Sequence, residues 1–195
     1  MLQEKPPAMQ PVPVRTHPCR ALSPKDGAFE TEMARLGRAA LSLMGGEGPP
    51  ILQVTGAGPG VGTSRVVLGL GDALARSDVP VGSFDLSSPV GHDIDMPRLR
   101  APSAGPRRDV VPARVTERYH DPAFDLVILD TPPIRSSALS MALPAHVGGV
   151  ILVVEADRST REEIADSLRA IEDCGGRCLG LVLNRRRRPF WRWRR

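Results

Sequence analysis

Short hydrophobic runs and helical patterns alternate along the central part of the chain. Runs rich in Val, Ile and Leu occupy residues 51–55, 79–85, 124–130, 149–155 and 178–184. Such runs are typical of parallel strands that are buried on both faces. Strands alternating with helices predict an α/β fold, a single doubly wound domain with a mostly parallel central sheet and helices on both faces.

Three helices are expected, at about residues 29–44, 64–76 and 159–173. In the last one, a hydroxyl cap at Ser159–Thr160 and acids in the first turn mark the start. The first helix should end at Gly45–Gly46. Its buried face is expected to consist of apolar residues at helical spacing: Phe29, Met33, Leu36, Ala40 and Leu43.

Composition divides the chain into three parts. Residues 1–27 are rich in proline and suit a flexible arm; residues 28–184 carry the domain, and residues 185–195 form a basic tail. Within the domain, residues 90–108 are expected to form a mobile loop, residues 109–115 a short strand and residues 116–122 a turn.

Charge is distributed unevenly. The net charge is +4, but residues 185–195 hold seven arginines and no acid, which leaves 19 basic against 22 acidic residues elsewhere. The three cysteines, Cys19, Cys174 and Cys178, are too few for a disulfide framework or a zinc site. No apolar segment approaches the roughly 20 residues of a membrane-spanning helix, and no signal peptide is visible, so a cytoplasmic location is expected.

A glycine-rich segment joins the first expected strand to the second helix. Its sequence is Val54-Thr-Gly-Ala-Gly-Pro-Gly-Val-Gly-Thr-Ser64. Glycines allow backbone N–H groups to approach a polyphosphate, and the following helix adds its dipole. The usual phosphate-binding loop ends in Gly-Lys-Ser/Thr, whereas this one has Thr63 in place of the lysine. The predicted nucleotide-binding residues are Gly58, Pro59, Gly60, Val61, Gly62, Thr63, Ser64 and Arg65.

A second candidate residue, Asp130, closes the hydrophobic run 124–130. An Asp at the carboxyl end of a strand beside a phosphate loop can hold Mg²⁺ directly or through water. Alone, such an Asp is more often a cap or turn residue. Together with the loop, and followed by Thr131-Pro-Pro133, it predicts a metal site formed by Ser64 and Asp130.

These motifs resemble the bacterial tyrosine kinases (BY-kinases) of capsule and exopolysaccharide synthesis, in their cytoplasmic CpsD/CapB type. The loop is similar to the family's Val-Thr-Ser-Ala-x-Pro-Gly-Glu-Gly-Lys-Ser, and residues 124–133 to its Tyr-Asp-x-Val-Ile-Ile-Asp-Thr-Pro-Pro. Residues 150–163 and 179–184 resemble less specific stretches of related P-loop ATPases. The resemblance implies a P-loop NTPase-like fold, ATP or ADP with Mg²⁺ as cofactors, and Asp85 and Asp130 as catalytic residues.

The resemblance also implies partners. Glu32, Arg35 and Arg38 fit the family's Glu-x-x-Arg-x-x-Arg oligomerisation motif, although a solvated polar helix face has the same pattern. Cytoplasmic kinases of this type work with a membrane polysaccharide co-polymerase or chain-length regulator. A homo-oligomer and a location at the inner membrane surface are therefore expected.

Four departures from the family pattern fall on the chemistry. Thr63 replaces the lysine, and the motif Asp-x-Asp-Leu-Arg-Arg-Pro has become Ser83-Phe-Asp-Leu-Ser-Ser-Pro89. The segment between Asp85 and Asp130 is shorter, and Tyr119 is the only tyrosine, so the C-terminal tyrosine cluster is absent. The sequence therefore indicates a degenerate or non-catalytic member. An active kinase or ATPase, with Arg65 replacing the lysine, and a ParA/MinD-like positioning ATPase remain alternatives.

The basic tail allows three interpretations: docking at an anionic membrane or a membrane partner, binding of single-stranded nucleic acid, or simple solubility. Membrane or partner docking is favoured by the family resemblance, and nucleic acid is the least expected. The docking residues are Arg185, Arg186, Arg187, Arg188, Trp191 and Trp193.

Overall fold

The computed structural model describes residues 27–45, 50–86 and 123–185. The expected loop 90–108, strand 109–115 and turn 116–122, and most of the arm and tail, lie outside these residues. Five strands form the sheet: β1 (Ile51–Gly56), β2 (Val81–Asp85), β3 (Leu126–Asp130), β4 (Gly149–Glu155) and β5 (Cys178–Asn184). All neighbouring pairs are parallel, in the order β2-β3-β1-β4-β5.

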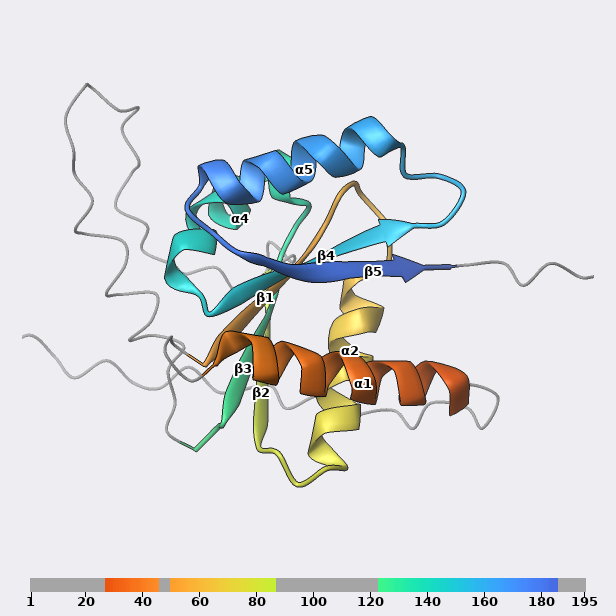
Figure 1. Ribbon diagram of the computed structural model, residues 1–195, viewed down its shortest axis with the longest axis vertical. Helices are drawn as coiled ribbons and strands as arrows, with labels where there is room; N and C mark the ends of the chain where they lie inside the picture. The colour runs from red at the N-terminus through yellow and green to blue at the C-terminus, as the bar shows by residue number, and fades with distance from the viewer. Residues whose placement is uncertain (1–26, 46–49, 87–122, 186–195) are drawn as a thin grey trace, which may run out of the picture.

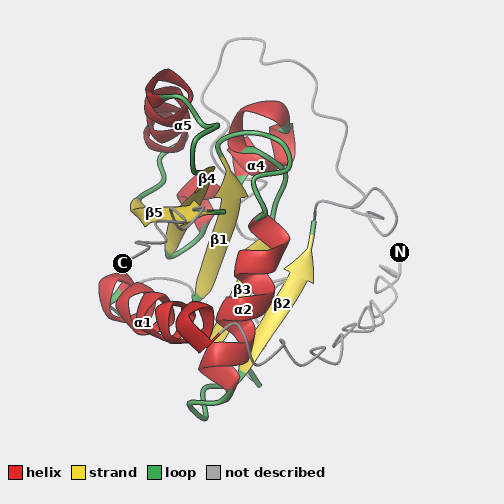
Figure 2. Cartoon of the chain, turned by 90° about the vertical axis from the view of Figure 1, so that its right-hand side faces the viewer, coloured by secondary structure: helices red, strands yellow, loops and turns green. Residues whose placement is uncertain are grey.

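Helices cover both faces of this sheet (Figures 1 and 2). Helices α1 (Gly27–Met44) and α2 (Thr63–Ala75) lie on one face, and α4 (Ala138–Ala142) and α5 (Arg161–Asp173) on the other. The alternation of side chains along β4 explains the two layers. Ile151 and Val153 pack into the core beneath α1 and α2, whereas Val150, Leu152 and Val154 pack with Ile171 of α5. The predicted doubly wound architecture is confirmed, and the described sheet is parallel throughout.

Most element boundaries fall within two residues of those expected, but one face assignment was wrong. Leu43 is 51% exposed, whereas Met33, Gly37 and Ala40 form the buried side of α1. A helix face with a period of 3.6 residues drifts from position 43 to position 44, and Met44 packs against the core instead. The five-residue helix α4 was not expected, because it is too short to show a periodic pattern.

The strand order places the glycine loop at the centre of one sheet edge. From β1 the chain moves outward to β2 and back to β3, and then crosses to β4 on the other side of β1. The carboxyl end of β1 is therefore the switch point where doubly wound sheets bind ligands. Residues 57–62 emerge there, between β3 and β4.

Candidate functional site: the glycine loop and its two carboxylates

The glycine loop has a backbone shape that depends on two glycines. Gly60 and Gly62 have φ angles of +72° and +92°, values that other residues rarely adopt. The Ala57 N–H donates to the Val153 carbonyl at 3.0 Å, which fixes the start of the loop to β4. Helix α2 follows at Thr63 without a side-chain cap. Its first N–H groups can therefore serve an anion.

The far end of β5 supports the same loop. The Asn184 side-chain amide donates to the Val61 carbonyl at 2.8 Å. A Cβ atom at Gly62 would collide with that amide. Gly62 is thus required both by its φ angle and by the close approach of Asn184, and the loop is held from two neighbouring strands.

The second part of the site is the carboxylate of Asp130, which the structure places beside Ser64. Asp130 is only 4% exposed, and the Ser64 hydroxyl donates a hydrogen bond to it. Asp85 stands opposite Asp130 in the register of β2 and β3. The structure therefore brings together Ser64, Asp85 and Asp130, the residues for which the sequence predicts metal binding and catalysis.

The environment of Asp130 leaves its charge incompletely compensated. Burial raises the pKa of this carboxyl from 3.8 to about 6; the Ser64 hydrogen bond lowers the pKa, and the Asp85 charge raises it. One carboxylate oxygen, Oδ1, is buried and has no hydrogen-bond partner among the described residues. Buried polar atoms are normally satisfied, so an unpartnered anionic oxygen calls for a cation or an ordered water. A hydroxyl and carboxylates are oxygen ligands of the kind that Mg²⁺ prefers, so these residues fit the ion.

Behind Asp130 lies a polar network that the sequence did not reveal. Gln53, fully buried in β1, donates to the Thr131 hydroxyl at 3.2 Å and to the Ser140 carbonyl at 2.9 Å. The hydroxyls of Thr55 and Ser140 both donate to the Pro132 carbonyl. Thr131 in turn donates to the Val54 carbonyl at 3.1 Å. The network fixes the segment that follows Asp130 to β1 and α4.

Two residues that the sequence predicts in the nucleotide site, Thr63 and Arg65, have contacts within the protein. Thr63, where a lysine would stand, is the first residue of α2, and its Oγ1 faces the start of the loop near Gly56. The Arg65 guanidinium carbon lies 5.1 Å from the centre of the Phe29 ring in α1. That is a cation–π contact between α2 and α1.

The remaining predicted sites are only partly described. Arg35 pairs with Glu32 of its own helix at 3.0 Å, and both side chains are more than 60% exposed. Arg38 is exposed as well. Of the tail, the structure describes Arg185 alone, and Arg186, Arg187, Arg188, Trp191 and Trp193 lie beyond the described residues.

Other types of site find little support within the described ranges. These contain no cluster of three or more His, Cys, Asp or Glu side chains that could hold a metal. Cys174 and Cys178 are free, and burial raises the pKa of both thiols. No helix among these residues is long and apolar enough to span a bilayer.

Sequence reasoning missed one cluster at this sheet edge. Glu155 ends β4 as Asp130 ends β3, and both Arg158 and Arg185 pair with it. The signal was present, since Glu155 is a carboxylate that closes a hydrophobic strand, but its partners are 3 and 30 residues away in the sequence.

Comparison with known proteins supports the resemblance over part of the chain. No family model matches. A 62-residue stretch is 34% identical to the tyrosine-protein kinase YwqD of Bacillus subtilis, covering 32% of this chain and 26% of that protein. A 62-residue stretch is also 32% identical to the tyrosine-protein kinase CpsD of Streptococcus agalactiae, covering 32% of this chain and 27% of that protein. These matches span about a quarter of each relative.

Solved structures match over most of the chain. The kinase domain of Escherichia coli tyrosine kinase ETK aligns with a TM-score of 0.62 and 21% identity, covering 85% of this chain and 80% of that domain. The chimerical protein CapA2B2 aligns with a TM-score of 0.58 and 20% identity, covering 87% and 88%. The resemblance drawn from the motifs is thus confirmed: the sequence relatives are named bacterial tyrosine-protein kinases, and the chain has the fold of their kinase domains.

Proposed function

We propose that this chain is a nucleotide-binding, catalytically degenerate BY-kinase-like protein that regulates a membrane complex of capsule or exopolysaccharide synthesis. One observation carries the proposal: the buried Asp130 carboxylate, hydrogen-bonded to Ser64 beside Asp85, has an oxygen next to the glycine loop that no described residue hydrogen-bonds. A site that had lost all contact with nucleotide would have no need to keep this costly arrangement. We therefore propose that the chain still binds nucleotide and that its catalytic turnover is reduced.

The chemistry of the residues matches them to parts of a Mg·nucleotide. Backbone N–H groups of residues 58–62 and the start of α2 would cradle the phosphates. Ser64 and Asp130 would hold Mg²⁺, and Asp85 would orient water or the ion. When bound, the ion supplies neutralisation of phosphate charge.

Loss of the lysine weakens such a site without abolishing it. One charge-assisted hydrogen bond is worth on the order of 1.5 to 3 kcal/mol, or roughly 10- to 150-fold in affinity. A site that is micromolar with lysine would remain measurable with Thr63. Phosphoryl transfer suffers more, because it depends on electrostatic stabilisation of charge that develops in the transition state.

The partners of the proposal are a membrane polysaccharide co-polymerase or chain-length regulator and other copies of the chain. Exposure of the Glu32 and Arg35 side chains is compatible with a contact to a neighbouring copy. The arginines and tryptophans of residues 186–195 have the chemistry to dock at an anionic membrane surface. This would give a cytoplasmic protein that is peripheral at the inner membrane.

Two rivals predict different behaviour. An active tyrosine kinase or ATPase needs a substitute cation such as Arg65, whose guanidinium lies over Phe29. A ParA/MinD-like positioning ATPase would couple turnover to binding of membrane or DNA, but the Lys-Gly-Gly start of that group's loop is missing.

Calorimetric titration with Mg·ATP and Mg·ADP tests the proposal. We expect micromolar to sub-millimolar binding by the wild type, tighter binding by Thr63→Lys, and loss of the Mg²⁺-dependent part in Asp130→Asn. Phosphate release should be negligible in the wild type. Turnover that disappears in Asp130→Asn would favour the enzyme rival, and a silent wild type beside a binding Thr63→Lys variant would reduce the chain to a scaffold.

A further inference from the structure

The ends of the five strands carry opposite charges on the two sides of the glycine loop. Asp85 and Asp130 end β2 and β3 on one side of β1, and Arg158 and Arg185 follow β4 and β5 on the other side. We propose that Arg158 and Arg185 supply the cationic contacts to nucleotide phosphates that Thr63 does not provide. This inference rests on the proposed nucleotide binding and assigns two further residues to it.

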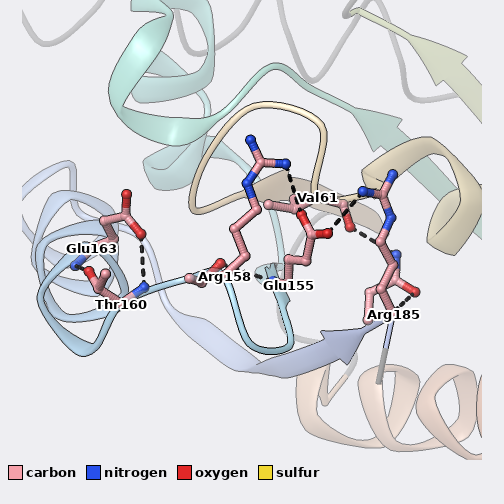
Figure 3. Close-up of polar contacts among 8 residues, drawn as sticks. Val61, Glu155, Arg158, Thr160, Glu163 and Arg185 are labelled. Carbon is pink, nitrogen blue, oxygen red and sulfur yellow. Dashed lines mark hydrogen bonds and ion pairs between the residues drawn. The ribbon is translucent and has the colours of Figure 1, made fainter. Parts of the chain in front are cut away.

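Glu155 holds both arginines at this edge (Figure 3). Arg185 Nη1 lies 3.0 Å from Glu155 Oε1, and Arg158 Nη1 lies 3.3 Å from Glu155 Oε2. The Arg185 hydrogen bond is the main reason why the pKa of Glu155 is lowered. Among the described residues Glu155 is the carboxylate that pairs with both arginines, so these three side chains together carry a net positive charge; the exposed Asp157 of the same turn pairs with neither arginine. That charge is available to an anion.

The backbone fixes where Arg158 starts. Residues 155–159 form a tight turn in which the Ser159 N–H donates to the Glu155 carbonyl and the Glu155 N–H donates to the Ser159 hydroxyl, both at 3.0 Å. Asp157 adopts a left-handed φ of +62° within it. The turn places Arg158 directly after β4, the strand to which Ala57 of the glycine loop is bonded.

Arg185 is attached to the loop even more directly. Its neighbour Asn184 donates to the Val61 carbonyl, and the Asn184 side-chain oxygen accepts from the Arg185 N–H at 2.8 Å. Arg185 itself has a φ of +57°. A left-handed conformation at a residue other than glycine costs free energy and is a common feature of functional positions. The second arginine is therefore anchored one residue from a loop contact.

Three other arginines of the described residues have contacts elsewhere. Arg65 contacts Phe29 of α1, Arg76 pairs with Glu30, and Arg135 pairs with Asp166 of α5. Guanidinium groups are suited to contacting nucleotide phosphates because they bind phosphate oxygens in a bidentate manner. The side chains of Arg158 and Arg185 are 66% and 52% exposed, so each can turn from Glu155 to a ligand without unfolding the turn.

The test is a double-mutant cycle with nucleotide affinity as its readout. Calorimetry with Mg·ATP compares Arg158→Met, Arg185→Met and the double variant with their parent, once in the wild-type chain and once in the Thr63→Lys background. Arg169→Met serves as a control, because Arg169 is an exposed, ion-paired arginine on α5. We expect the double variant to bind Mg·ATP about 10- to 100-fold more weakly than the wild type. In the Thr63→Lys background the same two substitutions should weaken binding by clearly less than about 10-fold, because the introduced lysine supplies the missing charge.

AMP separates phosphate contacts from contacts to the base or ribose. If the arginines contact the outer phosphates, which AMP lacks, the arginine variants should still bind AMP in a displacement titration. Equal losses for AMP and ATP would overturn the inference, and so would a double variant that binds like Arg169→Met. If the double variant binds like Arg169→Met, the proposed function stands and the inference fails. If the wild type binds neither ATP nor AMP, both the proposed function and the inference fail. Unchanged thermal unfolding of the variants checks that they are folded.

Discussion

The two sides of the glycine loop differ in how their charges are held. On the acidic side, Asp130 is 4% exposed, and within the part of the chain that the structure describes one of its oxygens has no hydrogen-bond partner. On the basic side, Arg158 and Arg185 are more than half exposed and share one carboxylate. The buried acid is preorganised for a cation and costs free energy in its absence. The exposed arginines cost little free energy and can reorient, and their charges are screened by salt.

In the proposed site, the two sides would bind the Mg·nucleotide in different ways, one with a preorganised carboxylate and the other with side chains that can reorient. The acidic side combines the buried Asp130 of β3 with the exposed Ser64 of α2 and Asp85 of β2, so core packing restrains Asp130 most tightly. The basic side lies on a turn and on the last described residue of the chain. In the proposed site, a carboxylate restrained by packing would hold the metal ion, and arginines on an adaptable surface would supply the cationic contacts that Thr63 does not provide.

Asp130→Asn should produce the largest change, by removing the buried charge of the acidic side. A carboxyl whose pKa is raised from 3.8 to about 6 binds its proton more tightly when folded. Its contribution is therefore fully present below pH 3.8 and is lost as the pH rises through 6. At a pH of about 7.5 without Mg²⁺, the variant should be more stable than the wild type by up to about 3 kcal/mol. At a pH of about 4 the two should be similar.

Urea unfolding at several pH values measures this effect. Ser64→Ala is a second test: because it removes the hydrogen bond to the carboxylate, the midpoint of the pH-dependent change in stability should move to a higher pH. Mg²⁺ should stabilise the wild type and not Asp130→Asn. Parallel pH profiles for the wild type and Asp130→Asn would contradict the assignment of this titration to Asp130.

Gly62→Ala should break the connection between the loop and the basic side. The substitution imposes a φ of +92° on alanine and drives its Cβ into the Asn184 amide. A cost of about 1 to 3 kcal/mol is expected from the backbone alone. Gly60→Ala is the matched control, since its φ is +72° but no atom of the described residues lies within 4 Å of a Cβ there. Equal unfolding free energies for the two variants would show that the Asn184 contact is unimportant.

Thr160→Ala should have a smaller effect on the basic side. Thr160 caps α5 through a capping box, in which its hydroxyl accepts from the Glu163 N–H at 3.1 Å and the Glu163 carboxylate accepts from the Thr160 N–H at 2.9 Å. Loss of the cap should cost about 1 kcal/mol in urea unfolding. Thr31→Ala, in the exposed first turns of α1, is the control and should cost less than half as much.

Arg35→Ala, on α1 and remote from both sides of the loop, should have the smallest effect on stability. Its ion pair with Glu32 is exposed and lies within one helix, so less than about 0.5 kcal/mol is expected. Light scattering coupled to gel filtration gives the second readout. A lower oligomer mass with unchanged unfolding would support the proposed contact between copies, and an unchanged mass would speak against it.

Much of the fold followed from local patterns. The five strands, the three long helices and the capped start of α5 were predictable because each depends on residues close in sequence. The proximity of Ser64 to Asp130 was also predictable, since Asp130 ends one parallel strand and Ser64 lies just after the loop that leaves another strand at the same edge. The exposure of Leu43 was mispredicted, because a helix contacts its neighbour along a face that the partner, here α2, selects. The short α4 gave no signal.

By itself, the sequence determined the α/β class, the glycine loop and the two carboxylates beside it, because strand ends and glycine spacing are local properties. Tertiary structure decided which strands are neighbours, and the strand order in turn decided which residues far apart in the sequence are in contact. It put Asn184 against Val61, joined Arg185 to Glu155, and buried Gln53 behind Thr131. These contacts span 30 to 123 residues, and no local pattern encodes them, because they arise only when the sheet order is fixed by packing.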